Sequence, residues 1–261
     1  GSTGATGAGA TGFTGATGSG GDPATPSTLG SVYAYTTTNT GNVYLGHCGG
    51  SITSSGTDSI AIGCGTLFNN TTGNANIAIG SAALFSNTVG QVNIALGTCS
   101  LYSNTIGQNN ISMGYCSLAK NTLSNVNISI GVNSLSHNTT GNFNIAQGYA
   151  VLYGNTEGSD NLAFGYSALG SNTTGNNNIA IGRSSLFNNT FGSSNIAIGE
   201  LAGSNITTGI NNTVIGQLLG TAGMQCTLLL GAGTCERVKV DNTGLYVNGS
   251  LFTGGGSDPA T

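Results

Sequence analysis

Six cysteines are the residues of this chain best suited to covalent chemistry. Cys99 and Cys116 are 17 residues apart, and the spacing of Cys48 and Cys64 is nearly the same. If 17 residues form one layer of a stacked structure, paired Cα atoms lie ~4.8 Å apart, within the range of a disulfide. The spacing therefore allows two disulfides, and a pair of buried free thiols is the alternative for Cys99 and Cys116.

The remaining two cysteines, Cys226 and Cys235, flank the apolar segment TLLLGAGT, and a disulfide between them would close a loop. An extracellular compartment would permit all three disulfides, within one chain or between chains. No two cysteines form a C-x-x-C motif, so we expect no zinc site.

Other titratable residues are too few and too scattered for catalysis. His47 and His137 are far apart in the chain, which argues against a paired imidazole site. Glu157 and Asp160 form the one close acidic pair, and we interpret them as solvated charges in a corner loop. A glycosidase needs two carboxylates that face each other, and no Ser-His-Asp set, P-loop or dinucleotide fingerprint occurs. We predict no catalytic, cofactor-binding or metal-binding residues, and no enzyme.

Exposed aromatic side chains are the best candidates for ligand binding. Tyr115, Tyr149 and Tyr166 each directly follow a glycine that recurs every 17 residues. Such a stripe could stack on sugar rings, and packing between chains is the alternative. A second set follows a recurring leucine, and we interpret it as packing between chains: Phe68, Phe85, Tyr102, Tyr153 and Phe187.

Composition excludes several classes of partner. Only 5% of the 261 residues are charged, against about 25% in ordinary globular domains, and 46 are glycine. The formal net charge is -4 and no basic cluster occurs, so we expect no nucleic-acid partner. No apolar run is long enough for a transmembrane helix, and we expect no membrane insertion. The chain begins at Gly1, and we expect it to be a mature or excised form.

The elements that must position these residues follow from an internal repeat. A phrase such as NIAIGSAALFSNTVGQV recurs, and its glycine returns every 17 residues at 46, 63, 80, 97, 114, 131, 148, 165, 182, 199 and 216. An asparagine opens the phrase from Asn76 to Asn212, and a leucine and a threonine keep the same interval. A strict period near twenty with short alternating apolar segments is typical of a β-solenoid, in which each repeat is one coil.

Side-chain alternation places Ile77 and Ile79 on one face of a short strand and Ala78 on the other. We expect the isoleucines, with Leu84 from across the turn, to fill the coil interior. The small residues at the Ala78 position would then let a second surface approach closely. The glycine of the recurring T-x-G corner is expected to supply a positive φ.

Stacked coils bring identical polar side chains into columns, so we expect ladders of asparagine amides and threonine hydroxyls. Asn70 and Asn138 also lie in Asn-x-Thr sequons, and glycosylation is the alternative interpretation of these residues. Ice binding by the threonine column is not favoured, because regular T-x-T faces are absent.

The phrase NIAIG-x-x-A-L with an Asn-Thr-x-Gly corner resembles the head repeats of YadA-like trimeric autotransporter adhesins and related phage and giant-virus fibre proteins. The resemblance covers residues 42 to 216. It implies a left-handed parallel β-roll, three chains around one axis and display on a surface. The repeat is longer than the usual adhesin unit, and the membrane-anchoring barrel of the bacterial family is missing.

The two ends differ from the repeat. Residues 1–28 carry glycines in triplets, which indicate a collagen-like Gly-X-Y segment, with a flexible linker as the alternative. Residues 29–45 are expected to form an N-terminal cap and 46–216 the β-roll of about ten coils. Residues 217–261 are expected to form a C-terminal cap, with a β-hairpin around Asp241, and a Gly-rich tail.

Together these features predict an all-β, homotrimeric and non-enzymatic protein. We expect a structural subunit of an extracellular fibre or filament on a cell or virion surface. Near-identical GDPAT and GSDPAT segments at the two ends suggest that trimers join head to tail into a filament, and a duplicated linker without a contact role is the alternative. The alternative is a receptor- or glycan-binding adhesin head whose partner is a host glycan or receptor.

Overall fold

The structure is a computed structural model that describes residues 27–29, 32–36, 41–46 and 55–251. Within these residues the chain is all β, with seventeen strands and no helix. The strands are β1 (Ser27–Leu29), β2 (Val32–Thr36), β3 (Val43–Leu45), β4 (Ile60–Ile62), β5 (Ile77–Ile79), β6 (Ile94–Leu96), β7 (Ile111–Met113), β8 (Ile128–Ile130), β9 (Ile145–Gln147), β10 (Leu162–Phe164), β11 (Ile179–Ile181), β12 (Ile196–Ile198), β13 (Thr213–Ile215), β14 (Leu228–Ala232), β15 (Cys235–Asp241), β16 (Gly244–Val247) and β17 (Ser250–Leu251).

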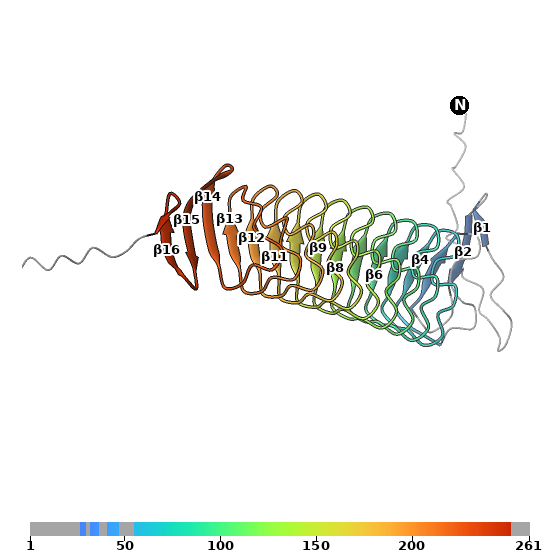
Figure 1. Cartoon of the computed structure of the whole chain (residues 1–261). Coiled ribbons are helices and arrows are strands. Elements are labelled where there is room, and N and C mark those ends of the chain that lie inside the picture. Colours follow the sequence, from blue (N-terminus) through green and yellow to red (C-terminus); the bar gives the residue numbers. More distant parts are fainter. Residues whose placement is uncertain (1–26, 30–31, 37–40, 47–54, 252–261) are drawn as a thin grey trace, which may run out of the picture.

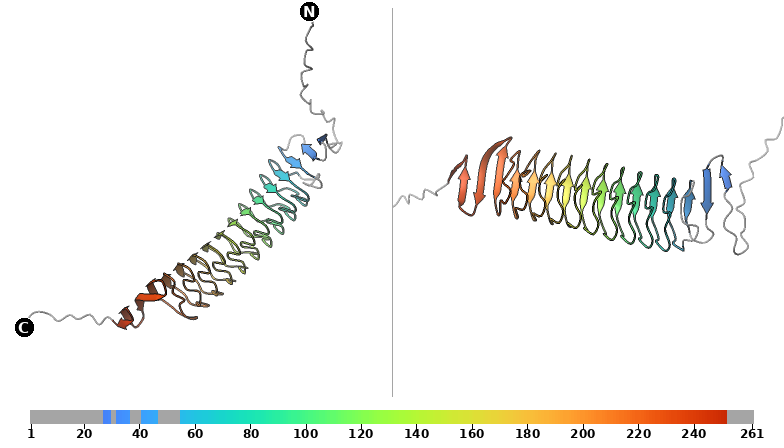
Figure 2. Two further views of the ribbon diagram at one scale, coloured as in Figure 1. Left: turned by 90° about the horizontal axis from the view of Figure 1, so that it is seen from above. Right: turned by 45° about the vertical axis from the view of Figure 1, so that its right-hand side comes forward.

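The strands form one long row (Figures 1 and 2). From β3 to β14 each strand pairs in parallel with the next, which makes about eleven turns of a β-solenoid. Most pairings join residues 17 apart, such as Ile77 with Ile94, whereas β13 and β14 join Thr213 with Leu228. The predicted solenoid and its 17-residue coil are confirmed.

The coil interior is filled by small and medium side chains. The central residue of each strand from β3 to β13 is buried, and so is the recurring leucine from Leu67 to Leu186. The flanking strand residues point outward, as Ile79 and Ile181 show, with 39% and 38% of their surface exposed. The predicted assignment of the isoleucines to the interior is therefore wrong. The coil is so narrow that Leu84 fills the space opposite the strand and leaves room only for Ala78.

Where the central strand residue is serine, the interior supplies a partner. Ser100 Oγ lies 2.7 Å from Ser112 Oγ, and Ser117 Oγ lies 2.8 Å from Ser129 Oγ. All four side chains are buried, and a buried hydroxyl without a partner would be destabilising. The two serines in the strand column are thus matched by serines on the facing side of the coil.

Buried asparagine ladders run along the rod as predicted. Asn87 Nδ2 donates to Asn70 Oδ1 at 2.9 Å, and the contact recurs with each coil as far as Asn189. The ladder ends there because the next coil carries Ile206, and Asn189 Oδ1 has no partner among the described residues. Asn70 and Asn138 are buried at the sequons, which leaves no room for a glycan in the folded coil.

The second asparagine column directly precedes the strands, and from Asn93 onward each member bonds both the previous asparagine and a corner carbonyl. Asn93 N donates to Asn76 Oδ1 at 3.0 Å, and Asn93 Nδ2 donates to Gly107 O at 2.8 Å. The threonine hydroxyls form a ladder of their own, in which Thr88 Oγ1 donates to Thr105 O at 3.0 Å. These hydroxyls are therefore engaged between coils.

The two glycine columns are required for different reasons. The scheduled glycines have φ of 105 to 134°, and a Cβ on Gly80 would lie 2.7 Å from the Gly97 carbonyl carbon. The corner glycines have no positive φ, contrary to our prediction. A Cβ at Gly73 would instead meet the carbonyl oxygen of Gly90 and the side-chain oxygen of Asn70, so the corner needs glycine for space. The positive φ values near the corner belong to other residues, including Leu84 (51°).

Antiparallel strands continue the sheet at both ends. β1 and β2 precede the roll, and β14 to β17 follow it as a meander. β15 and β16 pair as an antiparallel hairpin, with Asp241 opposite Gly244. The collagen-like triplets up to residue 26 and the GDPAT and GSDPAT segments lie outside the described residues.

Candidate interaction surfaces

The largest uniform surface is the outer face of the sheet, which we call the isoleucine face. It consists of the first and third residues of the three-residue strands β3 to β13 and the matching residues of β14. None of these side chains is charged, and only two, Gln147 and Thr213, are polar. A sheet face turned to water normally carries polar side chains, and a long apolar strip on such a face marks an interaction site. The members are Val43, Ile60, Ile77, Ile94, Ile111, Ile128, Ile145, Leu162, Ile179, Ile196, Thr213, Leu228 and Leu45, Ile62, Ile79, Leu96, Met113, Ile130, Gln147, Phe164, Ile181, Ile198, Ile215, Leu230.

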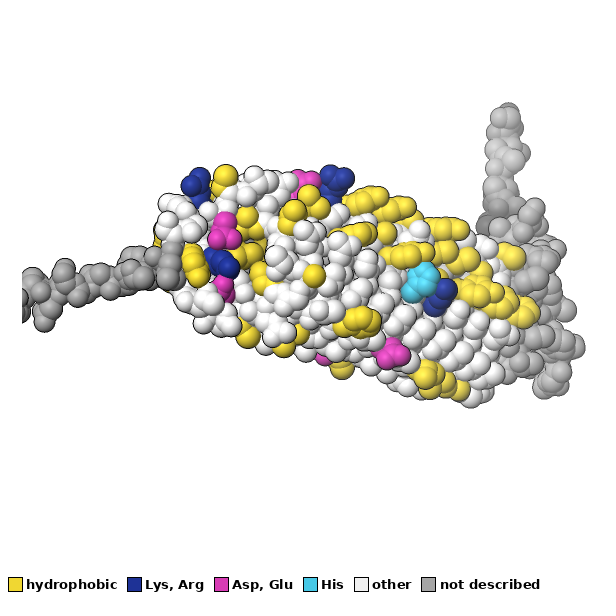
Figure 3. All heavy atoms as spheres, in the orientation of Figure 1, with side chains coloured by type: hydrophobic (Ala, Val, Ile, Leu, Met, Phe, Trp, Pro, Cys, Tyr) yellow, Lys and Arg dark blue, Asp and Glu magenta, His cyan; other side chains and the backbone are white. Residues whose placement is uncertain are grey.

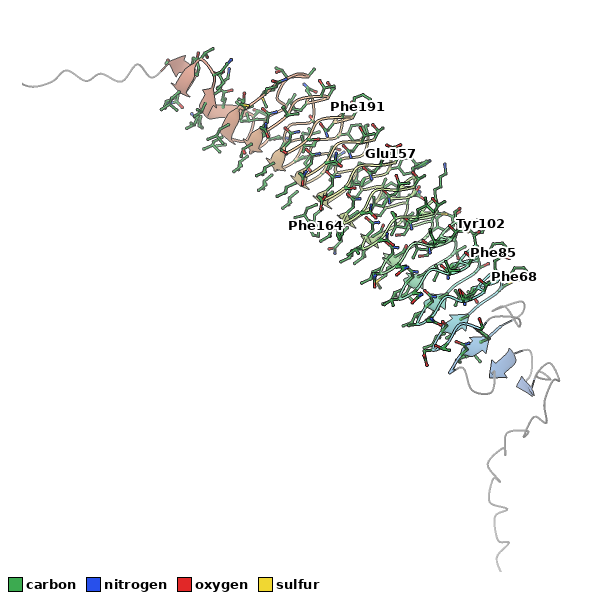
Figure 4. All side chains as sticks on the ribbon, turned by 90° about the horizontal axis from the view of Figure 1, so that it is seen from below. Phe68, Phe85, Tyr102, Glu157, Phe164 and Phe191 are labelled. Atoms are coloured by element: carbon green, nitrogen blue, oxygen red, sulfur yellow. The ribbon has the colours of Figure 1, made fainter. Side chains whose placement is uncertain are left out.

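A row of aromatic rings lies away from that face. Figure 4 shows Phe164 on the strand side of the coils and Phe68, Phe85 and Tyr102 on the other side. The Phe68 and Phe85 ring centroids are 5.3 Å apart, those of Phe85 and Tyr102 are 5.2 Å apart, and the rings are nearly parallel. The row ends at the next coil, which has Ala119 at this position. Stacking across coils is therefore one role of this aromatic set.

The predicted tyrosine stripe is brought together only in part. Tyr149 and Tyr166 stack with centroids 5.1 Å apart and planes 10° apart, and both are exposed. Tyr115 stands apart because the coil between it and Tyr149 carries Val132. Each ring of the stacked pair covers one face of the other ring. A ligand beside the row would therefore contact the ring edges and the hydroxyls.

Cys99 and Cys116 occupy the same position in neighbouring coils, as predicted, and both are partly exposed thiols. Partial burial and the adjacent Cys116 thiol raise the pKa of Cys99. A hydrogen bond with the Cys116 thiol raises the pKa of Tyr115. The two thiols thus lie in neighbouring coils at the surface, and Tyr115 adjoins Cys116 in the sequence.

The other cysteines are not grouped in this way. Cys226 precedes β14 and Cys235 follows it, so the five-residue strand separates them by ~17 Å. A disulfide needs Cα atoms within about 7 Å, so these two thiols are not placed to form one within a single chain. Cys64 is an exposed thiol, and Cys48, its predicted partner, lies outside the described residues.

On the face seen in Figure 3 the charged and imidazole side chains are few and lie singly or in small groups. Glu157 and Asp160 are both exposed, as expected for solvated corner residues. His137 packs edge-on against Tyr153, with ring centroids 4.5 Å apart, and His47 lies outside the described residues. Among the residues described, no three His, Cys, Asp or Glu side chains gather as a metal site would require, and no helix could cross a membrane.

Sequence reasoning missed a second apolar surface at the corner of the coils. Val89, Ile106 and Leu123 occupy one column in successive coils, with 38%, 45% and 48% of their surface exposed. Val126 and Phe143 lie in a nearby column and are also exposed. The sequence signal for this surface was the presence of large apolar residues in columns where other coils carry Thr140, Glu157 or Asp160.

Searches against protein-family models, curated proteins and solved structures found no match. The function is therefore argued from the surfaces described above.

Proposed function

We propose that this chain is a structural subunit of an extracellular fibre or filament, on a cell or a virion, in which three chains associate through their isoleucine faces. The observation that supports the proposal is the uncharged strip that runs along β3 to β14. Such a strip suits a partner that is equally long and regular, and a copy of the same solenoid has both properties.

The magnitudes favour association. Complete burial of one large aliphatic side chain contributes about 1.5–3 kcal/mol. Bringing proteins together costs about 4–15 kcal/mol in lost motional freedom. Partial burial of the isoleucine face along twelve strands is therefore enough to hold chains together.

The remaining parts of the proposal concern the ends and the handedness. A left-handed roll and a collagen-like segment suit a three-chain assembly, because collagen winds three chains together and the resemblance implies three chains around one axis for the roll. The β15–β16 hairpin serves as a cap, since antiparallel strands end the parallel stack and limit strand addition at its edge. Trimers join head to tail through their Gly-rich ends.

Oligomer mass tests the proposal. Light scattering after gel filtration should show the wild-type chain as a trimer. Substitution of Ile79→Lys with Ile181→Lys should yield monomers, because it places charges on the isoleucine face. The control, Thr98→Lys with Val132→Lys, adds the same charge at exposed positions outside that face and should remain trimeric. A wild-type chain that stays monomeric at its highest soluble concentration contradicts the proposal.

Electron microscopy tests the filament. Head-to-tail joining predicts rods of variable length, in which a junction between neighbouring trimers recurs once per solenoid length. Isolated rods of one length, at concentrations where the trimer is intact, would restrict the proposal to the trimer.

The second candidate function is a receptor- or glycan-binding adhesin head without enzymatic activity. The exposed stacked pair Tyr149 and Tyr166 favours it, because tyrosines combine an apolar ring edge with a hydroxyl. Binding to glycan arrays or host cells that is lost in Tyr149→Ala with Tyr166→Ala would support this function. Binding that is unchanged in this variant, or absent from broad panels, would leave the structural role.

A further inference from the structure

One layer of the isoleucine face differs from all others in its column. The outer column of third strand residues is apolar from Leu45 to Leu230 except at Gln147. Gln147 pairs in register with Ile130 on one side and with Phe164 on the other. A primary amide thus lies in the middle of an otherwise apolar column.

The Gln147 side chain is exposed, and no hydrogen bond holds its amide among the described residues. Strand β9 is also the one strand between β3 and β13 in which both outward residues, Ile145 and Gln147, are exposed. Burial of an amide against apolar side chains is unfavourable unless its donors and acceptor find partners. Whatever covers the isoleucine face must therefore offer a hydrogen-bonding group at this level.

A repeat protein that associates through such a face has a register problem. Every coil presents nearly the same apolar pair, so a shift by one coil exchanges isoleucine for isoleucine and loses only one layer of contact. Repeated apolar surfaces specify register poorly unless one layer is different. A single polar layer in an apolar interface is an established way to specify alignment and oligomer state in coiled coils.

This inference rests on the proposed trimer: we propose that Gln147 sets the register of the three chains. The three amides meet at one level of the interface, and each donates one N–H to the carbonyl oxygen of the next. Three donors and three acceptors close a ring, so each chain gives and receives one bond. A shift by one coil would place each amide against Ile130 or Phe164 of its neighbour and leave it unpaired. The occupant of this face is therefore a parallel, unshifted copy of the chain.

Gln147→Glu tests whether the three side chains converge. Glutamate has nearly the same shape, and no other titratable group lies on the isoleucine face. At pH 8 three converging carboxylates repel one another, and we expect the trimer dissociation constant to rise at least about tenfold relative to pH 4. The control Gln108→Glu adds the same charge at an exposed corner residue and should show the wild-type pH dependence. A Gln147→Glu trimer that is as pH-independent as this control overturns the proposal.

Gln147→Ile tests the register directly. A spin label on a ketone-bearing amino acid at exposed Ser81 avoids the six native cysteines and reports distances between chains. The wild-type trimer should give one narrow distance. Gln147→Ile should remain trimeric but give several distances, and Gln147→Ile with Ile130→Gln should restore one. A single unchanged distance in Gln147→Ile overturns the register role while leaving the trimer intact, whereas a monomeric wild type overturns both proposals.

Discussion

At the residue scale, one corner of each coil requires a left-handed backbone conformation whose energetic cost depends on the residue type. Ten residues in one corner column, from Asp58 to Asn211, have φ of 53 to 59°. Asn and Asp adopt this left-handed conformation readily, whereas β-branched residues do so at a cost of about 1–2 kcal/mol. Val92 and Val126 occupy this column with exposed side chains, so local backbone strain is retained there.

Substitution of Val126 by Asn should therefore stabilise the fold. Val126 has φ of 59° and asparagine is already tolerated in this column, at Asn109 and Asn177. We expect about 1 kcal/mol of added stability in urea unfolding. The matched control is Val132→Asn, which is equally exposed but has no positive φ, and its stability should change little. Equal effects at both positions would refute the strain argument.

The Cys99 and Cys116 thiols form a second feature at this scale. Their identical positions in neighbouring coils predict that a mild oxidant joins them before it joins Cys226 to Cys235. A disulfide that closes a loop of this length contributes about 3 kcal/mol by restricting the unfolded chain. Peptide mass mapping identifies the bond, and melting with and without reductant measures its effect. Cys99→Ser with Cys116→Ser should melt at the same temperature under both conditions.

At the scale of the coil, stability depends on ladders that no single coil can form. Asn138 Nδ2 lies 2.8 Å from Gly141 O, and Asn138 Oδ1 accepts a 2.7 Å hydrogen bond from Asn155. Asn138→Ala removes both contacts and the bonds from Asn138 Nδ2 to Asn121 Oδ1 and Ser124 Oγ, so buried groups on two other coils lose a partner, whereas Gly141 O keeps its bond from Asn127. We expect a loss of about 2–4 kcal/mol in denaturant unfolding, since each unpaired buried group costs about 1–3 kcal/mol. Gln108→Ala removes an exposed amide side chain and should change stability by less than about 0.5 kcal/mol.

The C-terminal hairpin is expected to respond to acid. Hydrogen bonds from Lys239, at 2.8 Å, and from Thr243 lower the pKa of Asp241 below its usual value. A carboxylate with a depressed folded-state pKa stabilises the fold above its unfolded pKa of about 4, and this contribution is lost as pH falls through the folded value. Hydrogen exchange of β15 and β16 amides should accelerate more below pH 4 in wild type than in Asp241→Asn, after correction for intrinsic rates. Identical profiles would show that this carboxylate has no such role.

At the scale of the whole molecule, the architecture was predictable because the scheduled glycines report the coil length directly. Alternation also predicted that Ile77 and Ile79 oppose Ala78, but it did not reveal which side is interior. That choice depends on the width of the coil, which is determined by contacts between Leu84 and the strand. The corner glycines were misassigned for a similar reason, because they are required by close contacts with the next coil, as at Gly73, and not by a positive φ.

The candidate surfaces were predictable to a smaller extent. The tyrosine and phenylalanine columns followed from counting residues, and their stacking confirms the column positions. The isoleucine face was placed inside the coil by our prediction, so its value as an interaction surface was hidden. Gln147 was overlooked because its importance depends on the outward direction of its column.

The constant pairing offset of most coils has a consequence for inheritance. A tandem duplication of the coding segment for one coil would add one layer of ~4.8 Å, and the strands above and below would still find equivalent partners. Loss of one such segment would shorten the rod equally simply. Gene variants that differ in copy number should therefore encode solenoids of graded length, whereas insertion of a single codon would interrupt every column that it crosses.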